Sequence, residues 1–373
     1  APYLCGPAHQ TIFFCNRRTS VEVLTRYLKE AAGTLGLEES EIRGYRGGYL
    51  PDLRRAIEAG LKDGQVKVVV STNALELGID IGRLDVAVLV GYPGTLASFW
   101  QRVGRVGRRG RTSLALLVTR SEPVDQYLAH HPDYLFGEAR ERLALDPDNL
   151  VLLSEQLKCA AFELPFHAGE DGAVADFGAS PHVPGILDYL AEESRLLLRR
   201  PAPGGTVWYW AADAYPAQDV SLAGAEPDNV LVFDEEERAI GEVDRAAALT
   251  KVHEGAIYLV EGETYKVERF DYANRRAHAR RLASDYFTEA ETDTEVRVLR
   301  LEEKAERRRA DGLAEVELWR GEVHVTTVAT MYKKIRFYSR ENVGAGGIHL
   351  PPEELDTEAF VLTLAPEAAA ELA

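Results

Sequence analysis

Two apolar, mostly β-branched runs most constrain how this chain can fold. They are VKVVVS at residues 66–71 and VAVLVG at residues 86–91. Continuous runs of this kind are typical of strands that are buried on both faces of a sheet. Such strands belong to parallel sheets whose two faces are covered by helices. The first third of the chain is therefore predicted to be an α/β domain with a parallel sheet.

The segments around these runs alternate between strand and helix patterns. Ser20 is expected to cap a helix that follows a buried strand, and Pro51 is expected to open a second helix. In parallel sheets, ligands bind beyond the carboxyl ends of the strands. The other predicted elements are the strand TIFFC (11–15), a short segment at IRGYRGG (42–48), a helix at 96–106 and the strand SLALLVT (113–119).

The pattern changes after about residue 121, where two accessory regions are predicted. Amphipathic helices at 148–163 and 184–198, followed by the aromatic run VWYWA, suggest a winged-helix-like domain over residues 136–215. Short strands separated by Gly and Asp-rich turns suggest a β-rich domain over residues 216–373. The charged segment 302–312 reads as a solvated turn or short linker. The α/β domain is assigned to residues 1–135.

Composition excludes several classes of function. The formal net charge of −17 argues against non-specific coating of nucleic acid or anionic membrane. There is no run of about 18 apolar residues, so no membrane span is expected. The 3 cysteines are few and widely spaced, which argues against a disulfide framework and a cysteine-based zinc site. We expect a monomer in a reducing compartment, cytoplasmic and nucleoid-associated if bacterial.

Against this acidic background, the run QRVGRVGRRG at residues 101–110 concentrates positive charge. Arg102, Arg105 and Arg108 recur every three residues, which on a helix would place neighbouring pairs on one side. Glycines between them let a phosphate or another backbone approach closely. Guanidinium groups bind phosphate oxygens two at a time. No Asp or Glu occurs from residue 86 to residue 121, so the run is predicted to bind an anion.

Three segments carry a resemblance to superfamily 2 helicases. They are IFFCNRRTSVEVL (12–24), the stretch from YRGGYLPDLRR to STNALELGIDIG (45–82), and QRVGRVGRRG. In order and spacing they resemble motifs IV, V and VI of the second RecA-like lobe. The wording STNALELGIDIG followed by YPGTLASFWQRVGRVGRRG is especially similar to the YprA/MrfA type of DNA repair helicase. The resemblance implies a RecA-like lobe followed by winged-helix and β-rich accessory domains.

The resemblance also implies a role for individual residues. Arg105 and Arg108 are similar to arginine fingers that reach the γ-phosphate of ATP, with Gln101 in the same interface. Asp80 resembles the aspartate of motif V that communicates with the nucleotide, and Glu76 stands where DEAD-box RNA helicases have arginine. The positions that resemble nucleic-acid contacts are Thr72, Gly78, Arg17 and Arg18, with Arg54 or Arg55 assisting.

Two motifs of a complete motor do not occur in this sequence. There is no GxxxxGK[ST] loop and no strand that ends in a DExH or DExD quartet, although phosphoryl transfer needs both a phosphate cradle and a magnesium-holding carboxylate. We therefore expect this chain alone to lack ATPase activity. ATP and Mg²⁺ would be bound mostly by a first RecA-like lobe that is missing here. The four-cysteine zinc module of the family is also missing.

The leading hypothesis is the C-terminal portion of an ATP-dependent DNA helicase or translocase, acting 3′ to 5′ in DNA repair on single strands and duplex junctions. A non-catalytic nucleic-acid-binding scaffold and an RNA helicase are the alternatives. Trp208 and Trp210 are candidate stacking platforms for unpaired bases, although core and ribbon packing is the interpretation that the sequence favours for them. RRAHARR (275–281) is either a contact for DNA or a solvated charge run.

Overall fold

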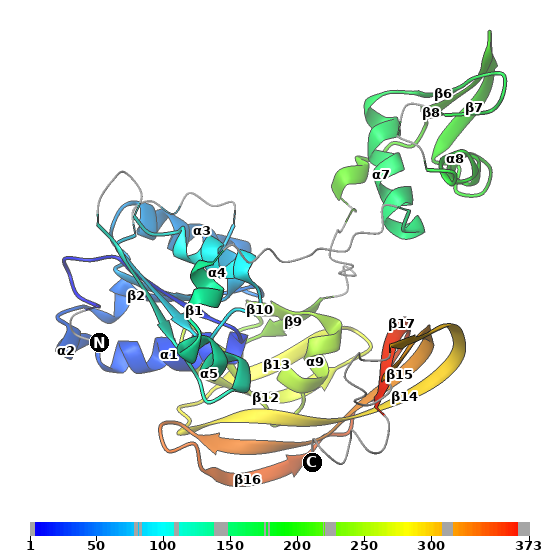
Figure 1. The fold of residues 1–373 in the computed structure, drawn as a ribbon. Helices are drawn as coiled ribbons and strands as arrows, with labels where there is room; N and C mark the ends of the chain where they lie inside the picture. Colours follow the sequence, from blue (N-terminus) through cyan, green and yellow to red (C-terminus); the bar gives the residue numbers. More distant parts are fainter. Residues whose placement is uncertain are drawn as a thin grey trace. The chain divides into compact units, whose positions relative to one another are not determined.

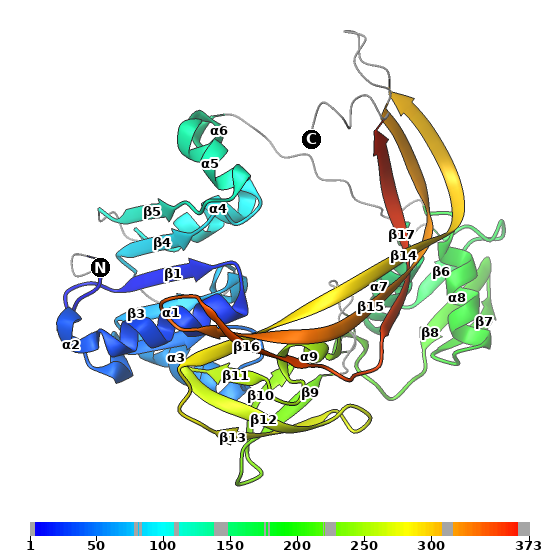
Figure 2. The same cartoon turned by 90° about the horizontal axis from the view of Figure 1, so that it is seen from below.

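The computed structural model describes residues 4–77, 81, 84–107, 112–137, 148–174, 177, 180–218, 220, 229–307 and 316–364. The chain divides into two compact units, one made of residues 1–139 and 228–373 and the other of residues 140–227. The first unit contains an α/β lobe and a β-rich part (Figures 1 and 2). In the described part of the chain, no helix is long and apolar enough to cross a membrane.

A parallel sheet of five strands in the order β2-β3-β1-β4-β5 forms the centre of the lobe, as predicted. Because β3 and β4 flank β1 on opposite sides, the chain crosses over β1 between them. This crossover is the kind of switch point at which parallel sheets bind ligands. The strands are β1 (Thr11–Cys15), β2 (Ile42–Tyr45), β3 (Val68–Ser71), β4 (Val86–Val90) and β5 (Leu114–Val118).

Helices cover both faces of this sheet, so it has two cores. On one face, Val21 and Leu28 of α1 pack on Val68 and Val70 of β3. On the other face, the apolar sides of four further helices, α3 to α6, share a core with alternate residues of the strands. These residues explain why the runs read as continuously apolar. The helices are α1 (Arg18–Glu30), α2 (Ala32–Leu35), α3 (Pro51–Lys62), α4 (Leu96–Val103), α5 (Pro123–His130) and α6 (Asp133–Phe136).

Two helix boundaries in the α/β lobe differ from those predicted. Helix α1 begins at Arg18 with Arg17 at the N-cap position, so Ser20 lies inside the first turn and is not the cap. Helix α4 ends at Val103, three residues before the predicted end at residue 106. Gly104 follows as its C-cap, and glycine has low helix propensity. The arginine run therefore leaves the helix after its first arginine.

The second unit has the winged-helix layout that the sequence predicted. Helix α7 (Leu150–Glu163) and α8 (Val183–Glu192) pack on a sheet in the order β6-β8-β7. The predicted helix at 184–198 is shorter, because residues from Leu197 onward pair with β8 as strand β7. The strands are β6 (Phe166–Ala168), β7 (Leu197–Ala202) and β8 (Gly205–Trp210), followed by the short helix η3 (Pro216–Gln218).

The β-rich part contains two sheets that the lobe contacts. The first has the order β10-β9-β13-β12-β11, and the second joins β14, β15 and β16, with β17 also paired to β15. Strand β14 (Tyr286–Arg307) and β15 (Val316–Arg336) form a long curved ribbon (Figure 2). The other elements are β9 (Val230–Phe233), β10 (Ala239–Val243), α9 (Arg245–Lys251), β11 (Ile257–Val260), β12 (Glu263–Asp271), β13 (Arg276–Arg281), β16 (Asn342–Gly347) and β17 (Glu353–Leu364).

The predicted turn or linker at 302–312 is contradicted where the structure describes it. Residues up to Arg307 continue strand β14 and pair with β15, because the ladder extends to Arg307 opposite Val316. Residues 308–312 lie outside the described residues.

Candidate nucleotide and nucleic-acid interface

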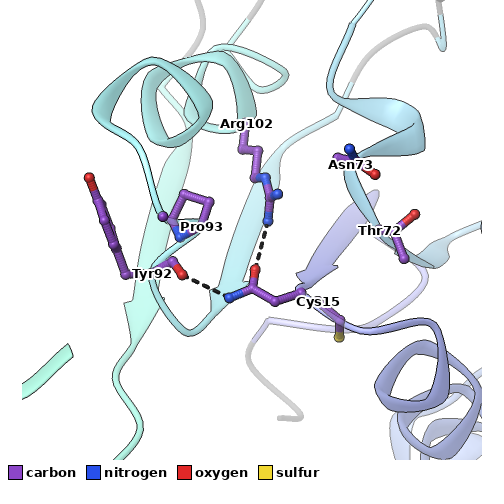
Figure 3. Close-up of a pocket in the computed structure, with 8 residues that line it drawn as sticks. Cys15, Thr72, Asn73, Tyr92, Pro93 and Arg102 are labelled. Atoms are coloured by element: carbon purple, nitrogen blue, oxygen red, sulfur yellow. Dashed lines mark hydrogen bonds between the residues drawn. The ribbon is translucent and has the colours of Figure 1, made fainter. Parts of the chain in front are cut away.

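A cavity of about 340 Å³ opens at the carboxyl end of strand β1. The ends of β1, β3 and β4 supply most of its wall, and helix α4 closes it with Arg102 (Figure 3). Thr72, which the sequence marked as a nucleic-acid contact, lies on this wall and is 8% exposed. The residues that line the cavity are Cys15, Asn16, Thr72, Asn73, Tyr92, Pro93, Gly94 and Arg102.

Arg102 is the charged centre of this wall, and its guanidinium bonds two other side chains of the lobe. Its Nε lies 2.8 Å from Oε2 of Glu76, and its Nη1 donates to Oδ1 of Asn16 at 3.2 Å. Both partners of the ion pair are nearly buried, with side-chain exposures of 5% and 10%. Ser98 also donates to Glu76, at 2.8 Å. This network joins β1, the turn after β3, and α4.

Burial also affects the thiol beside this network. Burial raises the pKa of Cys15 to about 12, although the nearby guanidinium groups of Arg102 and Arg120 act in the opposite direction. The thiolate form is therefore scarce at neutral pH, and a thiol rather than a thiolate lines the cavity. Cys15 is therefore poorly suited to act as a nucleophile here.

The candidate arginine fingers follow this network along the chain. Gln101 is exposed on the last turn of α4, and Arg105 lies beyond the end of the helix, partly exposed. The predicted helical spacing is thus wrong for Arg102 and Arg105, because α4 ends before Arg105. Gly107 has a φ of 80°, a left-handed conformation that glycine adopts without strain. Arg108, Gly78 and Asp80 lie outside the described residues.

The other predicted contacts lie at a separate place on the lobe. Arg17 is exposed at the start of α1, and Arg18 lies in the first turn, where its Nη1 is 2.8 Å from Oδ2 of Asp244. Asp244 belongs to the β-rich part. On α3, Arg55 forms an exposed ion pair with Asp52, and Arg54 is partly buried. The structure does not bring these arginines together with Thr72 in one cavity.

The lobe and the β-rich part are held together by a buried ion pair. Oε1 of Glu22 accepts hydrogen bonds from Nε of Arg46 at 2.6 Å and from the hydroxyl of Tyr49 at 2.8 Å. Its other oxygen, Oε2, accepts from the backbone N–H of Gly262 at 3.0 Å, and Nη2 of Arg46 donates to the carbonyl of Leu259 at 2.7 Å. Both side chains of the ion pair thus also bond the backbone of the β-rich part.

The turn between β11 and β12 reaches this interface through Glu261 and Gly262. Nε of Arg43 lies 2.5 Å from Oε2 of Glu261, whose other oxygen accepts from the N–H of Gly44 at 2.8 Å. Burial raises the pKa of Glu261, and Arg43 and Lys29 act against it. Gly262 has a φ of 80°, and a Cβ there would lie 3.2 Å from the backbone of Arg26. The close approach therefore requires glycine.

Comparison with known proteins agrees with this arrangement of parts. The family model "Helicase conserved C-terminal domain" matches residues 3–110, which include the parallel sheet up to β4 and the arginine run. The model "ATP-dependent helicase HRQ1, winged helix domain" matches residues 145–225. The order of the two matches is the order of the lobe and the winged-helix unit along the chain.

One relative extends the similarity over nearly the whole chain. The "Uncharacterized ATP-dependent helicase YprA" of Bacillus subtilis (strain 168) is 44% identical over 359 residues, which is 95% of this chain and 46% of the relative. The crystal structure of the helicase MrfA bound to DNA covers 96% of this chain and 46% of that one, with 43% identity and a TM-score of 0.77. The chain belongs to the superfamily 2 helicases of the YprA/MrfA type.

A further relative and a second MrfA structure also match more than nine-tenths of this chain. The ATP-dependent helicase HRQ1 of Saccharomyces cerevisiae is 32% identical over 92% of this chain and 31% of the relative. A crystal structure of MrfA bound to DNA and AMPPNP matches with a TM-score of 0.72 and 41% identity, over 93% of this chain and 45% of that one. The chain thus spans about half the length, or less, of the relatives it matches.

The structure corrects one aromatic prediction within the winged-helix unit. Trp208 is 3% exposed, packs in the core with Leu157 and Leu187, and donates from Nε1 to Asp188 at 3.1 Å. Its ring has no open face for a base to stack on. Trp210 is only partly buried, and its ring meets Phe162 edge to face with centroids 6.2 Å apart.

The basic segment RRAHARR forms strand β13, where its charges are balanced. Arg276 pairs with Glu237, Arg280 with Glu268 and Arg281 with Glu263, at 2.7–3.1 Å. The side chains of these pairs are exposed to solvent, where an ion pair contributes little to stability. The pairing favours the solvated charge run over a dedicated DNA contact.

The sequence interpretation missed the contacts that Asn16 and Glu76 make at the cavity wall. Asn16 donates to the carbonyl of Tyr92 at 2.7 Å and accepts from Arg102, so it links the ends of β1 and β4. Its place directly after a buried strand was the available signal, since polar residues there face the ligand side of a parallel sheet. The sequence marked Glu76 only as a departure from the DEAD-box pattern and did not indicate which residue it pairs with. Its partner is Arg102.

Proposed function

We propose that this chain supplies the second motor lobe and accessory parts of an ATP-dependent DNA helicase or translocase. One observation carries the proposal. The Asn16–Arg102–Glu76 network fixes the end of α4 on the carboxyl edge of the sheet, and the arginine run begins where that helix ends. A segment anchored at one end can present Arg105 to a second lobe in a defined position.

The residues present fit one side of a nucleotide site. Gln101 is exposed on the last turn of α4 and Arg105 is partly exposed just beyond it, and guanidinium and amide donors suit the oxygens of a terminal phosphate. Arg108 and Asp80 would join them by resemblance. A phosphate loop and a magnesium-binding acidic quartet do not occur in the sequence, so those parts must come from another lobe. When bound, ATP and Mg²⁺ would supply the phosphoryl group and neutralise its charge.

Movement along DNA follows from where this chain's contacts lie. In the proposal, Arg105 reaches the nucleotide when the two lobes close, and Arg17, Arg18 and Thr72 hold backbone phosphates of one strand. Because contacts to phosphate carry no sequence information, the grip can be repeated at every step along the strand. DNA in the structures of the similar helicase MrfA supports DNA as the substrate. We extend the proposal to 3′ to 5′ movement and to DNA repair.

The deciding experiment uses a protein that contains this chain together with a first lobe carrying a phosphate loop. Arg105→Ala is expected to lower ATP hydrolysis by about 10³-fold to 10⁵-fold, the range for arginine fingers, while DNA binding changes little. Arg269→Ala, a change at a strand position where the side chain is 68% exposed, is the matched control. Equal loss of hydrolysis and DNA binding in Arg105→Ala would indicate a structural role and contradict the proposal.

Two further assays separate the alternative functions. Unwinding of matched DNA and RNA duplexes with 3′ or 5′ overhangs tests substrate and direction, and preference for RNA would favour the RNA helicase. A scaffold would bind the duplexes without hydrolysing ATP even when the first lobe is present. The isolated chain is expected to show no ATP hydrolysis above background, and turnover by a clean preparation would refute that expectation.

A further inference from the structure

A second cavity, of about 650 Å³, lies between the α/β lobe and the β-rich part of the same compact unit. The start of helix α1 forms one wall, and α9 with the first residues of β14 forms another. Arg17 and Arg18, the proposed nucleic-acid contacts, line this cavity beside the buried Arg46. The cavity is therefore continuous with the proposed nucleic-acid contacts of the lobe.

Positive charge converges on this cavity in a chain whose net charge is −17. Four acidic residues also line it, and three of them are already paired, Glu22 with Arg46, Glu122 with Arg120 and Asp244 with Arg18. Among the described residues, no ion pair is formed by Arg17, Lys251 or Arg340. The cations that line the cavity are Arg17, Arg18, Arg46, Arg120, Lys251 and Arg340.

Lys251 is a cation of the β-rich part that lies beside the first turn of α1. Its Nζ lies 3.3 Å from Oγ1 of Thr19, in the first turn of that helix. Loss of hydration lowers the pKa of Lys251, Glu289 opposes this, and the guanidinium groups of Arg46, Arg17 and Arg18 lower it further. An anion placed among these groups would relieve their mutual repulsion.

The backbone at this point adds a partial positive charge. Helix α1 has 13 residues, no acidic residue in its first turn, and no side chain that caps its first N–H groups from the N-cap position. The N-terminus of such a helix favours anions. Thr19 and Ser20, also on the cavity wall, add hydroxyl donors of the kind that bind phosphate oxygens.

We propose that this cavity holds a phosphodiester group of the nucleic-acid strand, with Lys251 of the β-rich part completing a phosphate site that Arg17 and Arg18 begin. The inference rests on the proposed function and extends it, because it makes the β-rich part a direct contact of the translocated strand. Asp244 competes for this site, since its carboxylate lies 2.8 Å from the guanidinium of Arg18. Removing its charge frees Arg18 for phosphate.

Fluorescence anisotropy with a labelled single-stranded DNA oligonucleotide, at several salt concentrations, tests the site in the complete chain. Lys251→Gln is expected to weaken binding several-fold and to reduce the slope of log K against log salt by about 0.7, the value for one lost contact on a single strand. Asp244→Asn is expected to strengthen binding. Lys266→Gln makes the same charge change on β12, outside the lining of the cavity, and is expected to leave binding unchanged.

The outcomes separate this inference from the function on which it rests. If Arg17→Gln weakens binding while Lys251→Gln equals Lys266→Gln, the inference is overturned and the proposed function stands. If the unaltered chain binds no oligonucleotide, nucleic-acid binding by this part and the inference fall together. Inorganic phosphate is the competing probe, and displacement of the oligonucleotide by micromolar phosphate would show a free-anion site instead. Weaker binding of the oligonucleotide by Asp244→Asn would contradict the inference that Asp244 competes with phosphate for Arg18.

Discussion

Arg46 and Glu22 form a buried ion pair 2.6 Å long, with side-chain exposures of 4% and 2%, at the junction of the α/β lobe and the β-rich part. The pair lies within the lobe, yet each partner also bonds the backbone of the turn region at Leu259 and Gly262. A charge buried in this way stabilises the junction only while all its partners remain. These hydrogen bonds join the lobe and the β-rich part within one compact unit.

Glu22→Ala is therefore expected to be strongly destabilising. It leaves the guanidinium of Arg46 buried without its carboxylate, which typically costs about 3–5 kcal/mol of unfolding free energy. Urea unfolding of the chain measures the change. Arg55→Ala, which removes an exposed ion pair with Asp52, is the matched control and is expected to cost about 0–1 kcal/mol. A similar small cost for both variants would contradict a structural role for the buried pair.

Substitution of Arg102 is expected to lower stability, whereas substitution of Arg105 is expected to lower ATP hydrolysis. Arg102→Ala leaves Glu76 buried and unpaired, so it should lower the unfolding free energy by about 3–5 kcal/mol. Arg105→Ala, by contrast, should act on ATP hydrolysis in the protein that carries a first lobe. Thermal unfolding and ATP turnover, measured on both variants, check the distinction. Wild-type stability in Arg102→Ala would mean that the network does not hold α4.

The three cysteines are expected to react with thiol reagents at very different rates. Burial raises the pKa of Cys15 to about 12 and also raises that of Cys5, and both side chains are 1% exposed. Cys159 is partly exposed on α7. At pH 8, an aromatic disulfide reagent should modify Cys159 first, as mass spectrometry can show. The Cys159→Ser variant should then react only after unfolding, and rapid labelling of Cys15 in it would refute the burial argument.

His253 is expected to make stability depend on pH. It is 1% exposed, and burial lowers its pKa below the ordinary value, with the carbonyl of Glu254 acting in the opposite direction. The unfolded chain takes up the proton near pH 6.5, whereas the folded chain resists it until lower pH. The resulting contribution to stability is present above about pH 6.5 and is lost as the pH falls toward the folded pKa.

Urea unfolding of the unaltered chain and His253→Gln between pH 5 and 8 isolates this contribution. The difference in unfolding free energy between the two should shrink as the pH falls, by at most about 1.4 kcal/mol per pH unit for one proton. Comparing the two proteins removes the effect of the other titrating groups, including Glu261, whose pKa shift has the opposite sign. A difference that does not change with pH would show that His253 titrates normally.

The sequence by itself determined the α/β lobe, the order of the accessory parts and the family. Runs such as Val68–Ser71 and Val86–Val90 predicted buried parallel strands because only helices on both faces can cover so much apolar surface. Residues that directly follow such strands, Thr72 among them, were placed at the ligand edge for the same reason. Local patterns of this kind depend on neighbours within a few residues.

Only the tertiary structure decided which polar and aromatic groups face inward. The sequence grouped Arg102 with the other arginines of the 101–110 run as an anion-binding cluster, but Arg102 turns to Glu76, 26 residues away, and Trp208 turns to Asp188. Gly262 meets Glu22 across 240 residues. A buried charge or polar group is stable only with a partner, and that partner can come from any part of the chain. Periodicity reports local faces, so it cannot reveal pairings that exist only after distant segments pack.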